Sequence, residues 1–397
     1  MQIQKILSKD SITTSLILSA LFFTSAESNS MTFEIYKAQN QQNFLKEKEK
    51  FQEYKEEQAK AFNTYKKELE KYWKNPLLTT KKKLVSYSKD KKSRSVIDFK
   101  NNELTIETLA KNQQEAQHKL ALTLAKAATF TTKDFYINDE LEQKIAKIEE
   151  KHKIKHSKID TKPVLAPIFF EKKPTRESVY KFIKKEINPT KITVNNTLTL
   201  NHEKLYTLHI KLPNDTTIKR SRIYYKDVKI ESLREQIPLS LIFAIIHSES
   251  SFNPMARSYV PAYGLMQIVP KTAGIDAYYY LYNEKKLVGS TYLYNAHNNI
   301  KMGSAYLHIL YYKYLRHIKD PKSRLYCTIA AYNTGAGNVA RAFVKSNNTY
   351  QAAQIINKLS PKEVYTKLLK NLRYEEPKKY LKNVTQRMET YHKIYES

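Results

Sequence analysis

Apolar residues recur with two different periods along this chain of 397 residues, and the change of period separates predicted helices from predicted strands. Between residues 44 and 73, aromatic residues and a leucine fall at helical spacings in a stretch rich in Lys, Glu and Gln. This spacing predicts a long amphipathic helix, which Asn75-Pro76 would end. Further helices are predicted at about 110–128 and 138–156.

Alternation with a period of two marks the predicted strands. The segment 93–110 contains two alternating runs on either side of Asn101-Asn102, which predicts a β-hairpin. A second pair of strands is predicted over 191–200 and 204–212. The first half of the chain therefore combines a small sheet with helices.

The pattern changes near Arg220, because helical spacings dominate from there to the C-terminus and tyrosine becomes abundant. We therefore predict an α+β N-terminal domain, a small sheet plus helices, at 29–215. A mainly α domain is predicted at 220–397.

The first residues have the features of an export signal. Lys5 and Lys9 precede an uncharged and mostly apolar stretch, 11–26, and small residues follow it. This order predicts a signal peptide at 1–28 and a periplasmic protein; the alternative is an uncleaved N-terminal segment that associates with the membrane. The single cysteine, Cys327, lies far from this region, so a lipoprotein anchor and an intrachain disulfide are both excluded.

The formal net charge of +29 suggests an anionic partner such as a cell-wall polymer or a lipid surface. Neither a zinc-finger spacing nor an RNA-binding aromatic signature is present, and export separates the chain from nucleic acid, so no nucleic-acid partner is predicted. Solvated lysine-rich faces explain the same charge without any partner.

One glutamate stands at the end of a very apolar run. Residues 239–246 predict a buried helix, and counting back from Glu249 by three, four and seven positions gives Ile246, Ile245 and Ile242. A free glutamate, with a pKa of about 4.3, is ionised near neutral pH, but apolar surroundings raise that value and keep the proton available for acid catalysis. The alternative is a structural glutamate paired with a nearby Lys or Arg.

A second carboxylate is not close in sequence. No Asp or Glu lies between Ser250 and Ile275, and Asp276 and Glu376 are the next candidates. Hydrolytic glycosidases usually use two carboxylates, so this absence favours a mechanism that needs only one.

Four stretches then occur in order: "HSESSFNP", "YGLMQIVPKTAG", "IAAYNTGAGNV" and "YEEPKKYLKNV". Together they resemble the lytic transglycosylases with a goose-lysozyme-like fold, which cleave bacterial peptidoglycan. The stretches "KSRSVIDFKNNELTIETL" and "DPKSRLYCTIAAYN" are similar to the membrane-bound lytic murein transglycosylase C subgroup. The resemblance is strong over 220–395 and looser over 44–215.

The resemblance implies a lysozyme-like catalytic domain and a lyase that acts on peptidoglycan glycan strands in cell-wall turnover. Glu249 would donate its proton to the oxygen that links N-acetylmuramic acid (MurNAc) to N-acetylglucosamine (GlcNAc). As the conjugate base it would then take the proton of the muramoyl 6-hydroxyl, whose oxygen closes a 1,6-anhydro ring without water. The acetamido group of the sugar would help to stabilise the charge at C1.

The resemblance also implies the residues around the substrate, which are Ser258, Gly264, Met266, Gln267, Tyr332, Asn333 and Tyr380. Tyr332 would position the carboxyl group of Glu249 by a hydrogen bond, and Glu376 would brace the scaffold. Simpler roles stay open for some of them: a turn hydroxyl for Ser258, a turn glycine for Gly264 and a core side chain for Met266.

Several alternatives remain at this point. The tyrosine-rich segments 276–283 and 290–297 would suit sugar stacking or simple packing equally well. The histidines lack ligand spacing, so neither a metal nor another cofactor is predicted, and we expect a monomer. The alternatives to a lyase are a lysozyme-like hydrolase on the same fold and a non-catalytic glycan-binding scaffold. Members of the family that carry a lipid anchor have a cysteine after the signal peptide, which this chain lacks.

Overall fold

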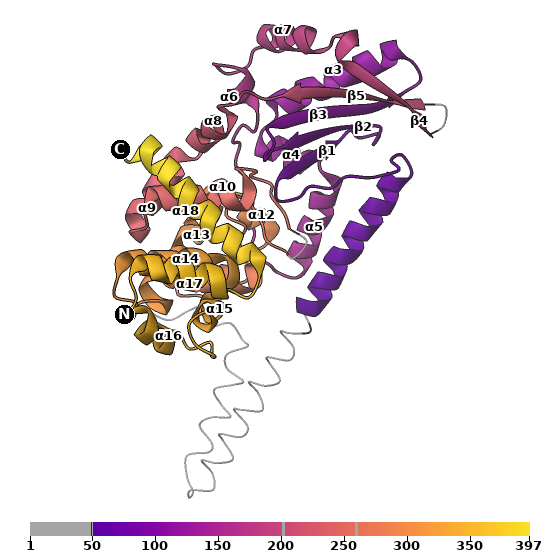
Figure 1. Cartoon of the computed structure of the whole chain (residues 1–397). Coiled ribbons are helices and arrows are strands. Elements are labelled where there is room, and N and C mark those ends of the chain that lie inside the picture. Colours follow the sequence, from indigo (N-terminus) through magenta and orange to yellow (C-terminus); the bar gives the residue numbers. More distant parts are fainter. Residues whose placement is uncertain (1–48, 50, 201–202, 259–260) are drawn as a thin grey trace, which may run out of the picture. The chain divides into compact units, whose positions relative to one another are not determined.

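The computed structural model describes residues 49, 51–200, 203–258 and 261–397 (Figure 1). The predicted signal peptide and residues 44–48 of the first predicted helix lie outside the described residues. The chain divides into two compact units, residues 1–60 and residues 61–397. Residues 51–60 of the first unit are helical, and so are residues 61–70 of the second.

A five-stranded antiparallel sheet forms the N-terminal part of the second unit, in the order β1-β2-β3-β5-β4 (Figure 1). Both predicted strand pairs are confirmed, because β2 pairs with β3 and β4 pairs with β5. One of the two edge strands, β1, was not predicted. The strands are β1 (Lys83–Tyr87), β2 (Ser93–Asp98), β3 (Glu103–Ala110), β4 (Ile192–Leu200) and β5 (Glu203–Lys211).

The two faces of the sheet belong to two cores, because successive side chains of a strand point to opposite sides. Leu84 and Ile97 lie in the large core, which continues into the helical part of the chain. Their neighbours Val85 and Val96 lie in a smaller core with Trp73 and other aromatic and aliphatic side chains. The sheet is therefore covered on both faces.

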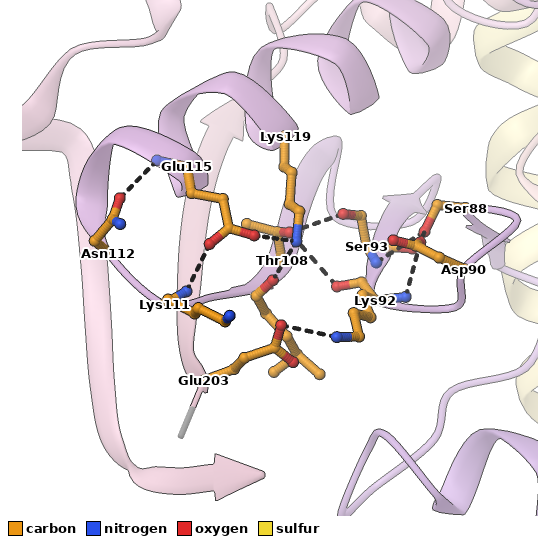
Figure 2. A network of polar contacts seen from close by, with 11 residues as sticks. Ser88, Asp90, Lys92, Ser93, Thr108, Lys111, Asn112, Glu115, Lys119 and Glu203 are labelled. Atoms are coloured by element: carbon orange, nitrogen blue, oxygen red, sulfur yellow. Dashed lines mark hydrogen bonds and ion pairs between the residues drawn. The ribbon is translucent and has the colours of Figure 1, made fainter. Parts of the chain in front are cut away.

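Polar contacts fix the start of α3 (Gln113–Thr129) directly after β3 (Figure 2). The Asn112 side chain accepts a hydrogen bond from the Glu115 backbone at 2.9 Å, and the Glu115 carboxylate accepts one from the Lys111 backbone at 2.9 Å. Such capping satisfies backbone N–H groups that the first turn of a helix leaves free. On the same side, the Lys92 ammonium contacts the Glu203 carboxylate at 2.8 Å and joins the β1–β2 turn to β5.

Helices fill the connection between β3 and β4. These are α3, α4 (Thr132–Asn138), α5 (Glu140–Lys151), α6 (Ala166–Phe169), α7 (Arg176–Glu186) and the 3₁₀ turn η1 (Pro189–Lys191). The predicted helices at 110–128 and 138–156 correspond to α3 and α5.

After β5 the described chain is helical and contains two short π-helical segments, η2 and η3. The elements are α8 (Thr216–Ile223), α9 (Tyr225–Glu235), α10 (Leu239–Ser250), η2 (Pro270–Gly274), α11 (Ile275–Tyr282), α12 (Ser290–Leu293), α13 (Ala296–His308), η3 (Ile309–Tyr314), α14 (Pro321–Thr334), α15 (Ala336–Arg341), α16 (Thr349–Ile356), α17 (Pro361–Asn371) and α18 (Glu375–Tyr395). The predicted fold class, a small sheet with helices followed by a mainly α part, is confirmed.

Buried polar contacts join the sheet and the helices within this unit. The Arg220 guanidinium on α8 donates to the Phe99 carbonyl at 2.9 Å and to the Asn102 side chain at 2.6 Å. The Glu149 carboxylate on α5 accepts a hydrogen bond from the Ser290 backbone, at the start of α12, at 2.6 Å. Buried donors and acceptors are costly unless they are paired, so these contacts fix how the N-terminal elements meet the helices.

Among the described residues, no helix has both the length and the apolar character needed to cross a bilayer.

Candidate active site

Helix α10 carries Glu249 in its last turn. The apolar residues that precede Glu249 are all buried, including Ile242, Ile245 and Ile246, so the helix runs through the core and has no solvent-facing apolar side. Helix α18 packs against it, and the Phe243 ring lies 4.7 Å from the Tyr395 ring. The predicted apolar surroundings of Glu249 are therefore present.

The turn that ends α10 has an unusual backbone. Ser251 and Phe252 both have positive φ angles, 52° and 66°, which side chains other than glycine adopt rarely and at a cost in energy. Two side chains stabilise the turn: the Ser250 hydroxyl accepts a hydrogen bond from the Phe252 backbone, and the Asn253 side chain accepts one from the Met255 backbone, both at 3.1 Å. The polar residues of the "ESSFNP" segment thus fix the backbone next to Glu249.

Burial raises the pKa of the Glu249 carboxyl above its usual value, because desolvation disfavours the charged form. Lys81, whose Nζ lies 4.0 Å from Glu249 Oε2, acts in the opposite direction, as do Tyr380 and Lys82, while the charge of Glu376 adds to the increase. Desolvation is the largest of these effects, since the Glu249 side chain is only 8% exposed. The carboxyl group therefore keeps its proton to a higher pH than an ordinary glutamate does.

Tyr380, on α18, is the predicted site residue that acts most directly on Glu249. Its hydroxyl is close enough to Glu249 to lower the pKa of that carboxyl. Within the described part of the chain, however, the Tyr380 hydroxyl has no hydrogen-bond partner. Desolvation, followed by the negative charge of Glu249, raises the pKa of Tyr380 well above its usual value. The phenol thus stays protonated and keeps a donor beside the carboxyl group.

Tyr332, on α14, uses its hydroxyl differently from the expectation. It donates a hydrogen bond to the Met266 carbonyl at 2.9 Å, so this proton is not directed at Glu249. Desolvation and then the charge of Glu249 raise the pKa of Tyr332 well above its usual value, which places the phenol near the carboxyl group. The expected hydrogen bond from Tyr332 to Glu249 is replaced by a contact that holds the loop around Met266.

Gly264 and Met266 are organised by a buried asparagine that the sequence did not point out. Asn299 on α13 accepts a hydrogen bond from the Met266 backbone at 2.7 Å and donates to the Leu293 carbonyl at 2.8 Å. Gly264 has a φ of 73°, and a Cβ there would lie 2.3 Å from Asn299 Nδ2. Glycine is thus required at position 264 for close packing against Asn299, and Met266 is a fully buried core side chain.

Gln267 and Ser258 lie in the same loop. The Gln267 amide donates to the Ala256 and Gly264 carbonyls, both at 3.1 Å, while its Oε1 atom is buried and lacks a hydrogen-bond partner within the described residues. The Ser258 hydroxyl accepts a hydrogen bond from the Ala262 backbone at 3.1 Å, which is the turn role that the sequence left open. Asn333 is half-buried beside Tyr332 on α14.

The two candidates for a second carboxylate differ in their surroundings. Asp276 is half-buried and accepts a hydrogen bond from the hydroxyl of the exposed Tyr314 at 3.0 Å. Glu376 is exposed in the first turn of α18, and its charge reaches Glu249 strongly enough to raise the pKa of that carboxyl. Glu376 is therefore electrostatically coupled to Glu249 while remaining in contact with solvent.

The tyrosine-rich segments contain both buried and exposed rings. Tyr278, Tyr292 and Tyr294 are buried in the core, whereas Tyr279 and Tyr282 are 48% and 41% exposed. Packing thus accounts for the first three, and sugar stacking stays a prediction for the two exposed rings. Within the described part of residues 61–397, no three His, Cys, Asp or Glu side chains gather at metal-ligand distances, and the absence of a metal stays a prediction.

Contacts from distant parts of the chain complete the site. Lys81 and Lys82 come from the segment before β1, more than 160 residues away from Glu249. No local pattern points to them, because exposed lysines are common in this chain. For Asn299 a signal existed: it shares the buried face of α13 with Ile300 and Gly303, where a polar side chain is unexpected.

Two family models match the chain. The model "Transglycosylase SLT domain" matches residues 228–355, which include α10, and the model "Membrane-bound lytic murein transglycosylase C, N-terminal domain" matches residues 39–149. Two solved structures are also similar. The lytic transglycosylase Slt of Pseudomonas aeruginosa, an inactive mutant, is 22% identical with a TM-score of 0.32, over 45% of this chain and 27% of that one. The 70-kDa soluble lytic transglycosylase of Escherichia coli is 24% identical with a TM-score of 0.33, over 43% of this chain and 24% of that one.

Curated relatives extend the similarity to most of the chain. The membrane-bound lytic murein transglycosylase C of Salmonella arizonae is 32% identical over 331 residues, which are 81% of this chain and 86% of the relative. The protein of the same name from Photorhabdus laumondii is 40% identical over 188 residues, 47% of this chain and 52% of the relative. The family indicated by the sequence motifs is confirmed: this chain belongs to the membrane-bound lytic murein transglycosylase C family.

Proposed function

We propose that this protein cleaves the β-1,4 bond between MurNAc and GlcNAc in peptidoglycan without water and leaves 1,6-anhydroMurNAc ends. The observation that carries the proposal is that the Glu249 carboxyl is buried and that desolvation raises its pKa. Membership of a lytic transglycosylase family supports the reaction type. Such a carboxyl can hold a proton near neutral pH and deliver it to a glycosidic oxygen.

In the first half of the reaction, Glu249 donates its proton to the glycosidic oxygen as the bond from C1 to that oxygen breaks. The GlcNAc part leaves as an alcohol, and the carboxyl group becomes a carboxylate. Positive charge develops at C1 of MurNAc, where the neighbouring acetamido group stabilises it. Lys81, with its Nζ 4.0 Å from Oε2, and the Tyr380 phenol favour the new negative charge on Glu249.

In the second half, the Glu249 carboxylate takes the proton of the 6-hydroxyl of the same MurNAc. The freed oxygen attacks C1 and closes the anhydro ring, so the proton that left Glu249 is replaced and no water is consumed. One carboxyl group is enough for both halves. This agrees with the positions of the other candidate acids, since Asp276 is engaged by Tyr314 and Glu376 is exposed.

Other predicted site residues are assigned by their contacts. Gln267 Oε1 is a buried acceptor without a partner in the described chain, and we assign it to an N–H or O–H group of the sugar. Asn333 and Ser258 are half-buried and provide polar groups near the same loop and helix. The shape of the site depends on three further residues. Gly264 packs against Asn299, the Met266 backbone donates a hydrogen bond to Asn299, and Tyr332 donates one to the Met266 carbonyl.

We further propose a periplasmic location, where the glycan strands are found, and association with anionic cell-wall or membrane surfaces through the high positive charge. The relatives are named membrane-bound, which supports association with a membrane. We expect the protein to act as a monomer. Binding to isolated sacculi should weaken as salt is added, because screening reduces the attraction between exposed charges.

The decisive test is mass spectrometry of the products that the purified protein releases from sacculi. The expected products end in 1,6-anhydroMurNAc, and Glu249→Gln should abolish their release because glutamine has no proton to donate. Reducing MurNAc ends would identify a hydrolase instead. Binding without any release of products, equal for wild type and Glu249→Gln, would identify a glycan-binding scaffold.

A further inference from the structure

The segment that leads into β1 lies directly against the turn that carries Glu249. The Asn253 side chain donates hydrogen bonds to the Thr80 carbonyl at 3.1 Å and to the Lys81 carbonyl at 3.4 Å. The Arg257 backbone also donates to the Thr80 carbonyl, at 3.5 Å. The N-terminal part of this unit therefore contributes backbone to the surroundings of the proposed catalytic acid.

Lys82 makes three hydrogen bonds to this turn. Its ammonium donates to the His247 carbonyl at 3.2 Å, to the Ser248 carbonyl at 2.8 Å and to the Ser251 hydroxyl at 3.2 Å. An ammonium group has three donors, so all of them are used. The Ser248 carbonyl is in the last turn of α10, where carbonyls lack helical partners and carry partial negative charge, which makes it a good acceptor for a cation. The His247 carbonyl accepts a second hydrogen bond, from the Ser251 backbone at 3.1 Å.

We propose that Lys82 is a positioning residue of the active site, which fixes the backbone on both sides of Glu249 and so determines where its carboxyl group lies. His247 and Ser248 precede Glu249 and Ser251 follows it, so the three acceptors of Lys82 bracket the acid. The inference rests on the proposed function, in which Glu249 is the proton donor. It makes the N-terminal sheet region part of the catalytic apparatus, beyond its covalent link to the helices.

The charges around Lys82 support a role beyond anchoring. Desolvation lowers the pKa of Lys82 to about 7, Glu249 opposes this decrease, and the nearby cations Arg387, Lys81 and Lys100 add to it. Burying the Lys82 ammonium costs free energy, because the charged group loses its hydration. A lysine that served only as a structural contact could keep its charge and its hydration at the surface.

The effect on Glu249 is also direct. Lys82 and Lys81 both lower the pKa of the Glu249 carboxyl, together with Tyr380, while Glu376 raises it. Arg387, from α18, donates to the Ser248 hydroxyl at 2.8 Å and completes the charged groups around this turn. Removal of the Lys82 ammonium should therefore both loosen the turn and move the pKa of Glu249 upward.

The test compares Lys82→Met with Lys92→Met. Lys92 is a matched control, because it is also half-buried in the sheet region, but its ammonium contacts the Glu203 carboxylate of β5 at 2.8 Å instead of the end of α10 (Figure 2). We expect Lys82→Met to lower kcat on soluble glycan strands about 10-fold or more with little change in KM, since a small misplacement of a catalytic group is costly. The alkaline limb of its pH profile should move to higher pH, and Lys92→Met should change neither quantity.

Three outcomes would overturn the inference. These are a wild-type kcat and pH profile for Lys82→Met, equal losses of activity in both variants, and a loss of activity without any change in the pH profile. If Lys82→Met does not fold, as judged by circular dichroism, Ser251→Ala removes one acceptor of Lys82 and should lower kcat a few-fold. Wild-type kinetics for Ser251→Ala would then reject the proposal.

Glu249→Gln separates this inference from the function on which it rests. If Glu249→Gln keeps full activity, the proposed catalytic acid is wrong, whatever Lys82 does. If Glu249→Gln is inactive while Lys82→Met behaves like wild type, only the role of Lys82 is rejected.

Discussion

The charge of Lys81 provides a direct test of how the surroundings set the acidity of Glu249. The Lys81 ammonium lies 4.0 Å from Glu249 Oε2, and it lowers the pKa of that carboxyl. Lys81→Gln removes this positive charge but keeps a polar side chain of similar length. The pKa of Glu249 should rise, because the anion loses a stabilising neighbour.

The size of the effect follows from the distance and the exposure. Two unit charges 4 Å apart attract each other by about 1 kcal/mol in water and by about 4 kcal/mol at an effective dielectric constant of about 20. The Lys81 side chain is 40% exposed, so the value for water is the appropriate one. About 1 kcal/mol corresponds to a pKa increase of about 0.7, since one pKa unit is about 1.4 kcal/mol.

The assay is the pH dependence of kcat/KM on soluble MurNAc–GlcNAc oligosaccharides, which reports the ionisation of the free enzyme. Glu249 must be protonated to act as the acid, so its ionisation sets the alkaline limb of the profile. Lys81→Gln should move this limb to higher pH by about 0.7 and increase the rate on the limb about 5-fold. Carboxyl ¹³C NMR, with Glu249 assigned through Glu249→Gln, measures the same pKa without catalysis.

Lys83→Gln is the matched control for this experiment. Lys83 stands two positions away, is 50% exposed, and has its Nζ 3.3 Å from a different carboxylate, Asp98 Oδ2. It changes the net charge equally but should leave the alkaline limb in place. An unchanged limb in Lys81→Gln, a shift to lower pH, or equal shifts in both variants would refute the electrostatic reasoning.

Two further predictions concern the groups around Glu249. Gly264→Ala would bring a Cβ to 2.3 Å from Asn299 Nδ2 at a φ of 73°, so we expect the free energy of unfolding, measured in urea, to fall by about 3 kcal/mol or more. In the control Gly337→Ala, on α15, the nearest atom to the new Cβ lies at 3.2 Å, and the free energy of unfolding should change by no more than about 1 kcal/mol. Equal losses in the two variants would contradict the packing argument. Tyr380→Phe should move the alkaline limb of the pH–activity profile to higher pH, because the Tyr380 hydroxyl lowers the pKa of Glu249. Tyr332→Phe removes a hydrogen bond to the Met266 carbonyl and should mainly reduce the stability of the protein. The reverse pattern would show that the roles of the two phenols have been exchanged.

Local patterns predicted the elements of the fold better than their arrangement. The β2–β3 hairpin and the β4–β5 pair were predictable because each pairs two segments that follow one another closely in the sequence. The contact of β3 with β5 joins segments about 100 residues apart, and no turn or period encodes it. The edge strand β1 was missed because it is short and only partly alternating.

The site shows the same division. The apolar run before Glu249 correctly predicted a buried acid, although α10 is buried on all sides and its helical face alone could not have decided the matter. The roles of the two tyrosines were not predictable from spacing, because Tyr332 and Tyr380 are on different helices and their hydroxyl directions depend on packing. Lys81 and Lys82 were equally hidden among the many lysines of the chain.

A single carboxyl group that acts first as the acid and then as the base needs some neighbours that favour its protonated form and others that favour its carboxylate form. Desolvation favours the protonated form that starts the reaction, whereas Lys81, Lys82 and Tyr380 favour the carboxylate that must form and then take a proton back. These opposing groups come from α10, from the segment before β1 and from α18, so no single stretch of sequence sets the acidity. An isolated helical part that lacked residues 80–82 would keep Glu249 and its apolar contacts, but it would lose two of the three groups that stabilise the anion. The position of residues 80–82 against the end of α10 is for this reason a requirement of the proposed chemistry as well as of the fold.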